Sequence, residues 1–330
     1  MAKEEGDGVA RGRRRTVVRV AAGVAVAGAV GLVFALRSPS PVGHWNSAEG
    51  RGAFGAAYAK AMREMPRPAG TADVRTDFGF VRIHRFAGAA GRDAPLVLLP
   101  GRAAPAPIWA DLMPHLLRIG DVYTIDLLGE PGHSVQETPI SSEADQAAWL
   151  DQTLSRLPER TFHVVGLSLG GWTAANLALR APGRVATLTL IEPVSTFAPI
   201  PLGTALRAIP ASVSWLPRSW RDSFASYTAG GAPVRDVPVA EMIEAGMRHY
   251  TSRLPQPSQI AEEALGGLGM PVLAVFAGRS VMHDAEESRR IAERALPRGT
   301  VKVYPEATHA VTGERPEGVA ADLAAFLDAV

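Results

Sequence analysis

The chain has 330 residues, of which 47% are hydrophobic and 20% are charged, so it can bury a full core and is not a disordered chain. Its net charge of +1 gives no reason to expect nucleic-acid binding. Cysteine is absent, which excludes disulfides, cysteine-ligated metals, iron–sulfur clusters and a cysteine nucleophile.

The N-terminal region has the pattern of an export signal or a membrane anchor. Residues 1–19 carry six basic and three acidic side chains, and residues 20–36 follow without a charge. A basic flank before an apolar run is typical of a signal peptide or signal-anchor, although this run is short for a bilayer-spanning helix. Residues 37–50 contain Pro and Ser and are expected to be a linker.

Three alternatives stay open for this region. As an uncleaved anchor, residues 20–36 would hold the rest of the chain on the outer side of the cell membrane. As a cleaved signal peptide, they would release a secreted protein. As a soluble helix, they would pack on the following domain, which is expected to span 51–330.

Short apolar runs alternate with helical stretches along the rest of the chain. Strands are expected at 80–86, 96–99, 122–127, 162–167, 185–191, 272–276 and 301–304. Helices are expected at 143–157, 170–181, 284–296 and 316–329. Strands that are apolar throughout and separated by helices predict an α/β fold, with a mostly parallel sheet covered by helices on both faces.

Residues 197–268 interrupt this alternation. They hold no convincing buried strand, and they contain several prolines, two tryptophans and two methionines. This composition predicts a helical insertion between two strands. Such a cap would shape a pocket if it lies over the strand ends. Its aromatic residues can instead form a small core of their own, and the two roles are compatible.

Ser168 stands in a sequence that favours a catalytic role. Residues 162–171 read FHVVGLSLGG, so an apolar strand leads into Gly166-Leu167-Ser168-Leu169-Gly170 and a helix follows. In this strand–turn–helix setting the G-x-S-x-G pattern projects the serine hydroxyl from a strained turn at a helix N-terminus. We therefore expect Ser168 to be a nucleophile.

A serine nucleophile needs a base and donors for the oxyanion. His309 follows the last expected strand, on a loop that can bring it to Ser168, and is the candidate base. The backbone N–H groups of Leu169 and Arg102 are the candidate oxyanion donors. Two other histidines, His133 and His283, are expected to be solvated or to lie at the edge of the pocket.

These residues resemble an α/β-hydrolase of the lipase/esterase-like group with a helical cap. The matching segments are LVLLPGR at 96–102, DLLGEPGHS at 126–134, GLSLGG at 166–171, VATLTLIEP at 185–193, PVLAVFAGR at 271–279 and EATHAVTGERPE at 306–317. The 126–134 stretch also resembles bacterial carboxylesterases. The resemblance covers about residues 75–328 and implies an eight-stranded type of sheet.

Two positions depart from the family pattern. The family's HG turn has a histidine where this chain has Pro100, but the oxyanion hole needs only the backbone amide beyond it. The family's acid stands three residues after the glycine that ends the seventh strand. That glycine is Gly278, and the corresponding residue is Val281, which cannot serve as an acid.

Two carboxylates are candidates for the missing acid. Glu192 directly follows the 185–191 strand, a position from which some α/β-hydrolases supply the acid. Asp284 lies nearer the usual position, but Asp284-Ala285-Glu286-Glu287 also reads as a capping box that opens a helix. Glu192, Asp284 and the absence of any catalytic acid all stay open, while Asp126 is expected to be a structural loop residue.

The sequence thus predicts a serine hydrolase that cleaves an ester, with an apolar ester as the expected substrate partner. No phosphate loop or metal-ligand cluster is evident, so neither a metal nor an organic cofactor is expected. Amide, lactone or C–C bond hydrolysis and haloperoxidase-type chemistry are alternatives on the same fold. A non-catalytic exported binding protein is the alternative outside enzymes, and the residue Val281 is its support.

Overall fold

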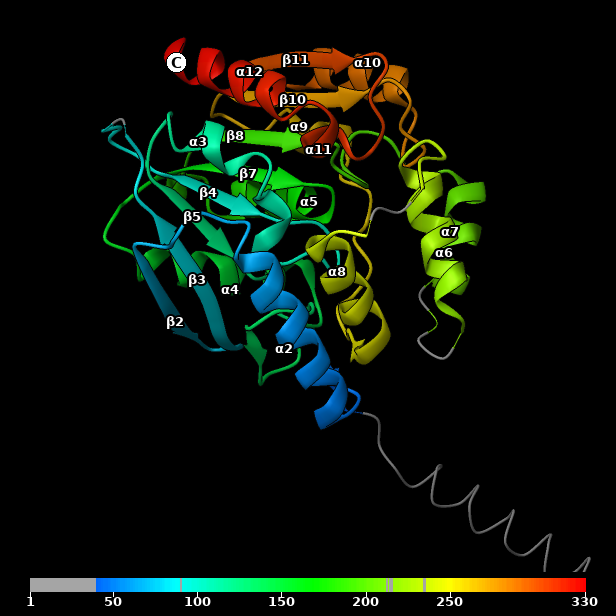
Figure 1. Cartoon of the computed structure of the whole chain (residues 1–330). Helices are drawn as coiled ribbons and strands as arrows, with labels where there is room; N and C mark the ends of the chain where they lie inside the picture. The colour runs from blue at the N-terminus through cyan, green and yellow to red at the C-terminus, as the bar shows by residue number, and fades with distance from the viewer. Residues whose placement is uncertain (1–39, 90, 212, 214–215, 234–235) are drawn as a thin grey trace, which may run out of the picture. The chain divides into compact units, whose positions relative to one another are not determined.

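A nine-stranded sheet forms the centre of the fold, and Figure 1 shows it with helices on both sides. The computed structural model describes residues 40–330 except 90, 212, 214–215 and 234–235. The chain divides into two compact units, Met1–Pro41 and Val42–Val330, and the sheet with its helices belongs to the second.

The sheet has the strand order β11-β10-β8-β7-β4-β5-β3-β2, with β6 paired to β3. Its strands are β2 (Gly70–Thr76), β3 (Gly79–Phe86), β4 (Leu96–Leu99), β5 (Val122–Ile125), β6 (Val135–Gln136), β7 (Phe162–Leu167), β8 (Val185–Ile191), β10 (Val272–Ala277) and β11 (Gly299–Tyr304). All pairs from β11 to β5 are parallel, whereas β3 pairs antiparallel with β5, β2 and β6. The carboxyl ends of the parallel strands therefore share one edge.

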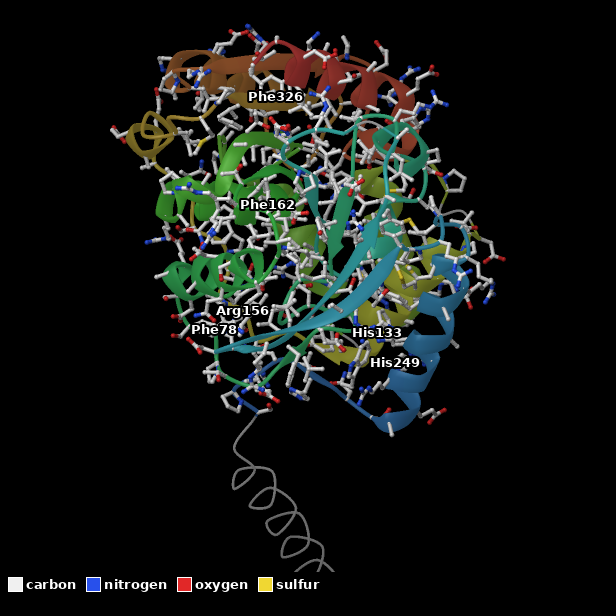
Figure 2. The ribbon with its side chains drawn as sticks, turned by 90° about the vertical axis from the view of Figure 1, so that its left-hand side faces the viewer. Phe78, His133, Arg156, Phe162, His249 and Phe326 are labelled. Atoms are coloured by element: carbon white, nitrogen blue, oxygen red, sulfur yellow. The ribbon has the colours of Figure 1, made fainter. Side chains whose placement is uncertain are left out.

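Helices cover each face of the sheet over a separate apolar cluster. One face is covered by α4 (Glu143–Ser155), α5 (Leu169–Arg180), α9 (Glu262–Leu265) and α10 (Ala285–Ala295). The other is covered by η1 (Ala106–Trp109), α3 (Met113–Leu116), α11 (Val311–Glu314) and α12 (Pro316–Asp328). Side chains that alternate along β4 show the division, since Val97 and Leu99 join the first cluster and Leu96 and Leu98 the second. Figure 2 shows Phe162 of β7 in the middle of the sheet and Phe326 of α12.

The predicted parallel strands and the four predicted helices are confirmed to within two residues at most ends. Strand β2 was not predicted, because its side chains are mostly exposed and give no apolar pattern, and neither was the two-residue strand β6. The short 3-10 helix η2 (Pro182–Arg184) connects α5 to β8. The apolar pattern therefore predicts the parallel strands and also β3, which matches the strand expected at 80–86, but it does not predict β2 and β6.

The cap consists of three helices, α6 (Leu202–Ala211), α7 (Arg218–Thr228) and α8 (Pro238–His249), followed by β9 (Tyr250–Thr251). Figure 1 shows them on the side toward which the strands β7, β8 and β10 point. The expected insertion at 197–268 is thus helical for the most part. Its last helix, α9, does not belong to the cap, because Leu265 is buried in the core under the sheet.

An N-terminal helix that the sequence pattern did not predict supports the cap. Helix α2 (Ala48–Met62) packs on α8, with Met242 buried among Phe54, Tyr58 and neighbouring alanines. Strand β1 (His44–Trp45) pairs antiparallel with β9 at the end of the same cap helix. Figure 2 shows His249 of α8, together with His133, beside α2. The predicted linker at 37–50 is therefore wrong for residues 44–45 and 48–50, which belong to folded elements.

The N-terminal predictions lie outside the described residues. This holds for the basic segment 1–19 and for the apolar run 20–36. Of the helices that the structure does describe, none combines the length and the apolar character needed to cross a bilayer.

Candidate active site

Ser168 lies at the sharp turn between β7 and α5. Its backbone has φ 54° and ψ −115°, an uncommon conformation for a residue with a side chain. The turn is possible because Gly166 and Gly170 have no Cβ: one on Gly166 would lie 2.2 Å from the Gly170 carbonyl oxygen, and one on Gly170 would lie 2.0 Å from that of Leu99. The predicted strand–turn–helix arrangement around the serine is confirmed.

His309 reaches this serine from the loop between β11 and α11. Its Nε2 lies 3.0 Å from Ser168 Oγ, and its Nδ1 lies 2.9 Å from Oε2 of Glu192. The carboxylate of Glu314, at the end of α11, holds the loop by accepting bonds from the Thr308 amide at 2.8 Å and the Thr308 hydroxyl at 2.7 Å. Nothing in the sequence pattern singled out Glu314 for this role.

Glu192 directly follows β8, and its carboxylate is fully buried. Its backbone has φ 49°, and the Ala277 amide donates to Oε1 at 2.6 Å. Burial alone raises the pKa of Glu192, but hydrogen bonds and positive charge from His283 and His309 outweigh it and lower the pKa to about 2. An ionised carboxylate therefore faces His309.

The alternative acid, Asp284, does not join this group. Its side chain accepts a hydrogen bond at 2.8 Å from the Glu287 amide and caps the N-terminus of α10. Among the contacts of the described residues it has none to His309. The capping interpretation of Asp284 is thus correct, and the structure brings Glu192 rather than Asp284 to the histidine.

The expectation that His283 is solvated or at a pocket edge is wrong. Only 2% of the residue is exposed, and its Nε2 lies 3.0 Å from Glu192 Oε1. Its position just before α10 gave no sign of this contact, which arises because the loop after β10 folds back toward the end of β8. His133, by contrast, is exposed and packs edge-on against Tyr58, with ring centroids 4.4 Å apart.

The candidate oxyanion donors come from two segments next to Ser168. Leu169 is the first residue of α5, and Arg102 follows Gly101, whose own Cβ would lie 3.5 Å from Cβ of Ser168. Neither the Arg102 nor the Leu169 backbone N–H donates to another protein group within the described part of the chain. Both donors are thus free to bind a substrate oxygen.

Two buried carboxylates hold the loops around these donors. Glu130 accepts a hydrogen bond at 2.9 Å from the amide of Ala103, which has φ 54° and directly follows Arg102. Asp126 accepts from the amides of Ala106 at 2.9 Å and His133 at 2.8 Å, which agrees with its predicted structural role. The role of Glu130 was not predicted, since a glutamate in a loop gives no signal of burial.

The described part of the chain offers no ligand set for a metal. No group of three or more His, Cys, Asp or Glu side chains that could hold an ion occurs among the residues that the structure describes. The polar atoms of Ser168, His309 and Glu192 bond to one another instead.

Comparison with known proteins shows what the chain is similar to. A family model described as alpha/beta hydrolase fold matches residues 94–231. An uncharacterized carboxylesterase, nap, of Bacillus subtilis is 25% identical over 78% of this chain and 86% of its own length. Carboxylesterase YbfK of the same organism is also 25% identical, over 83% of this chain and 93% of its own.

A solved structure has the same fold. The crystal structure of carboxylesterase CesB (YbfK) from B. subtilis superposes with a TM-score of 0.78 and covers 86% of this chain and all of that one, at 23% identity. The chain therefore has the α/β-hydrolase fold. It is a carboxylesterase-like hydrolase, similar to these two B. subtilis proteins.

Proposed function

We propose that the protein hydrolyses carboxylic esters through an acyl-enzyme intermediate on Ser168. The observation that supports this most is the hydrogen-bonded series from Ser168 Oγ to His309 Nε2 and from His309 Nδ1 to Glu192. A nucleophile, a base and an orienting carboxylate in this order are the requirements of acyl transfer by serine.

The reaction follows from the positions of the three side chains. Ser168 Oγ attacks the ester carbonyl carbon, and its proton passes to Nε2 of His309. The carbonyl oxygen becomes an oxyanion that accepts from the N–H groups of Leu169 and Arg102. When the C–O bond to the alcohol breaks, the alcohol takes the proton from His309.

Water completes the cycle by the same route. It attacks the acyl carbon while His309 takes its proton, and the acid leaves as the proton returns to Ser168. Throughout, Glu192 accepts the Nδ1–H of His309 and stabilises the imidazolium form that appears in each half. The alternative of a non-catalytic binding protein rests on Val281, and the carboxylate of Glu192, 2.9 Å from His309, supports the catalytic function instead.

Labelling with a fluorophosphonate tests this function. The full-length protein is treated with the probe, and the modified residue is located by peptide mass. We expect one adduct, on Ser168, that is absent in Ser168→Ala and forms far more slowly in His309→Ala. A folded wild-type protein that takes no label and hydrolyses no ester would contradict the proposal.

We further propose that the substrate has a medium-sized apolar acyl or alcohol group. The helical cap on the side of the strand ends supports this, since α6, α7 and α8 carry Phe224, Tyr227 and other large side chains. A series of p-nitrophenyl esters of increasing acyl length should give a maximum of kcat/KM at intermediate length. Equal values along the whole series would contradict it.

The placement of the enzyme is a separate proposal that rests on sequence alone. The basic segment 1–19 and the uncharged run 20–36 support an anchor in the cell membrane, with the hydrolase on the outer side. Carbonate extraction and protease accessibility in intact cells test this. A soluble extracellular product that lacks the run would instead indicate a cleaved signal peptide, and a soluble cytoplasmic product would contradict both.

A further inference from the structure

Glu192 is shared by two histidines, of which only His309 has a role in the proposed reaction. His283 Nε2 lies 3.0 Å from Oε1, and His309 Nδ1 lies 2.9 Å from Oε2. The side chain of His283 is 1% exposed and that of Glu192 is 0% exposed, so water is excluded from their contact. A buried histidine at this place calls for an explanation beyond packing.

The protons of this group can be assigned from the contacts. An ionised carboxylate only accepts, so His283 carries hydrogen on Nε2 and donates it to Oε1. In the neutral ring Nδ1 then accepts from the hydroxyl of Ser288, whose Oγ lies 3.1 Å away. Oε1 also accepts from the Ala277 amide, so Oε2 is left for His309. Each oxygen of Glu192 thus has a defined partner.

We infer that His283 is a positioning residue for the proposed ester hydrolysis, which holds the carboxylate of Glu192 so that Oε2 faces Nδ1 of His309. The inference rests on the proposed function. The hydrogen bond from His283 resists rotation of the carboxylate, and it satisfies an oxygen that water does not reach. Glu192 in turn keeps the ring of His309 in line with Ser168.

The charge of His283 affects the same carboxylate. Burial lowers the pKa of His283, but the hydrogen bond and negative charge of Glu192, with a smaller contribution from Asp284, outweigh it and raise the pKa above its ordinary value of 6.5. These two carboxylates are the charged groups that act on it, one after β8 and one at its own helix. A protonated His283 therefore competes with the imidazolium of His309 for Glu192.

Two substitutions of His283 separate the effect of its hydrogen bond to Glu192 from the effect of its positive charge. His283→Gln keeps an N–H donor near the position of Nε2 but cannot be protonated, whereas His283→Leu removes both. Because hydrogen bonds to charged groups are strong, we expect kcat of His283→Leu to fall about 10- to 100-fold with little change in KM. His283→Gln should keep kcat within about threefold of wild type.

The pH dependence of kcat/KM provides a measurement that a loss of packing alone would not change. Both variants lack the competing charge, so His309 takes up its proton more readily and the acid limb of kcat/KM should move up by about half a pH unit or more. His163→Leu is the control, because it removes a half-buried histidine that bonds to Thr187 and not to the site. It should not move the limb.

The outcomes are distinct. Wild-type kcat and an unmoved acid limb in His283→Leu would overturn the inference, and so would equal losses of kcat in both variants with an unmoved limb. If wild type labels at Ser168 and the variants behave as wild type, this inference fails and the proposed function stands. If wild type neither labels nor hydrolyses esters, both fail.

Discussion

Glu192 combines three unusual properties in one residue. It has positive φ, its carboxylate is fully buried, and that carboxylate accepts hydrogen bonds from the Ala277 amide and two histidines. A strained backbone and a buried charge both destabilise the fold unless their surroundings compensate. Their occurrence together supports a functional reason for the residue.

The first prediction concerns the two acids that the sequence left open. Glu192→Gln keeps the size of the side chain but cannot stabilise the imidazolium, so kcat should fall by about 10²- to 10⁴-fold. Asp284→Asn can still accept the hydrogen bond of the Glu287 amide at the start of α10, so its kcat should stay within about twofold of wild type. Steady-state kinetics with one ester measures both. A larger loss in Asp284→Asn than in Glu192→Gln would contradict the assignment.

The second prediction follows from the signs of two pKa shifts. The pKa of Glu192 is lowered from 4.5 to about 2, so its contribution to stability is complete above about 4.5 and is lost as the pH falls toward 2. The pKa of His283 is raised above 6.5, so its contribution is complete below 6.5 and is lost as the pH rises through the folded value.

Together the two pKa shifts define a pH range in which both groups stabilise the fold. The difference in free energy of unfolding between wild type and Glu192→Gln should be largest at pH values between 4.5 and 6.5 and smaller on either side. Urea unfolding of both proteins at an acidic, an intermediate and an alkaline pH measures it. A difference that does not vary with pH would show that the two groups are not coupled to folding in this way.

At the scale of elements, the apolar runs predicted the parallel strands and their helices, and the G-x-S-x-G pattern between a strand and a helix predicted the turn at Ser168. The same pattern could not give α2, because its helix is made largely of Ala and Gly and has no clear apolar face in the sequence. The sequence pattern did not predict the contact between His283 and Glu192 either. His283 reaches it across 91 positions of sequence, and only the fold brings them together.

The third prediction concerns the contact between cap helices α7 and α8. Arg221 of α7 binds Glu244 of α8 through Nε at 2.8 Å and Nη2 at 2.7 Å, and the Arg221 side chain is only 3% exposed. Removing one partner of a buried pair leaves the other charge uncompensated, at a cost of about 3–5 kcal/mol. Arg221→Ala should therefore loosen the cap, and hydrogen exchange of the α7 and α8 amides should become faster while that of β7 and β8 does not change.

A matched control lies one turn earlier on α7. Arg218 pairs with Asp222 at 3.3 Å, and its side chain is 53% exposed, so Arg218→Ala should cost less than about 1 kcal/mol and leave exchange unchanged. Because the cap lies at the strand ends, KM should rise in Arg221→Ala and not in Arg218→Ala. Faster exchange throughout the sheet in Arg221→Ala would show a global rather than a local effect.

At the scale of the whole molecule, the folded unit begins earlier than the resemblance to α/β-hydrolases implied. The resemblance starts at about residue 75, whereas residues 42–62 supply β1 and α2 to the cap. Tyr58 of α2 also reaches below the cap, where its hydroxyl lies 3.0 Å from His84 Nε2 and 3.4 Å from Asp126 Oδ1. This segment therefore connects the cap to the loop that bears Asp126.

The last prediction uses two truncations to separate the N-terminal region from this connection. A chain that starts at Val42 keeps β1, α2 and all the contacts of the second unit, so its thermal midpoint and its rate of Ser168 labelling should match those of the full chain. A chain that starts at Arg63 loses Phe54 and Tyr58, each of which buries apolar surface worth about 1.5–3 kcal/mol, and leaves Met242 exposed on α8. Its thermal midpoint should fall by several degrees and its labelling should slow, because the cap and the Asp126 loop lose their common support. Equal behaviour of the two truncated chains would show that α2 only covers the cap and does not stabilise it.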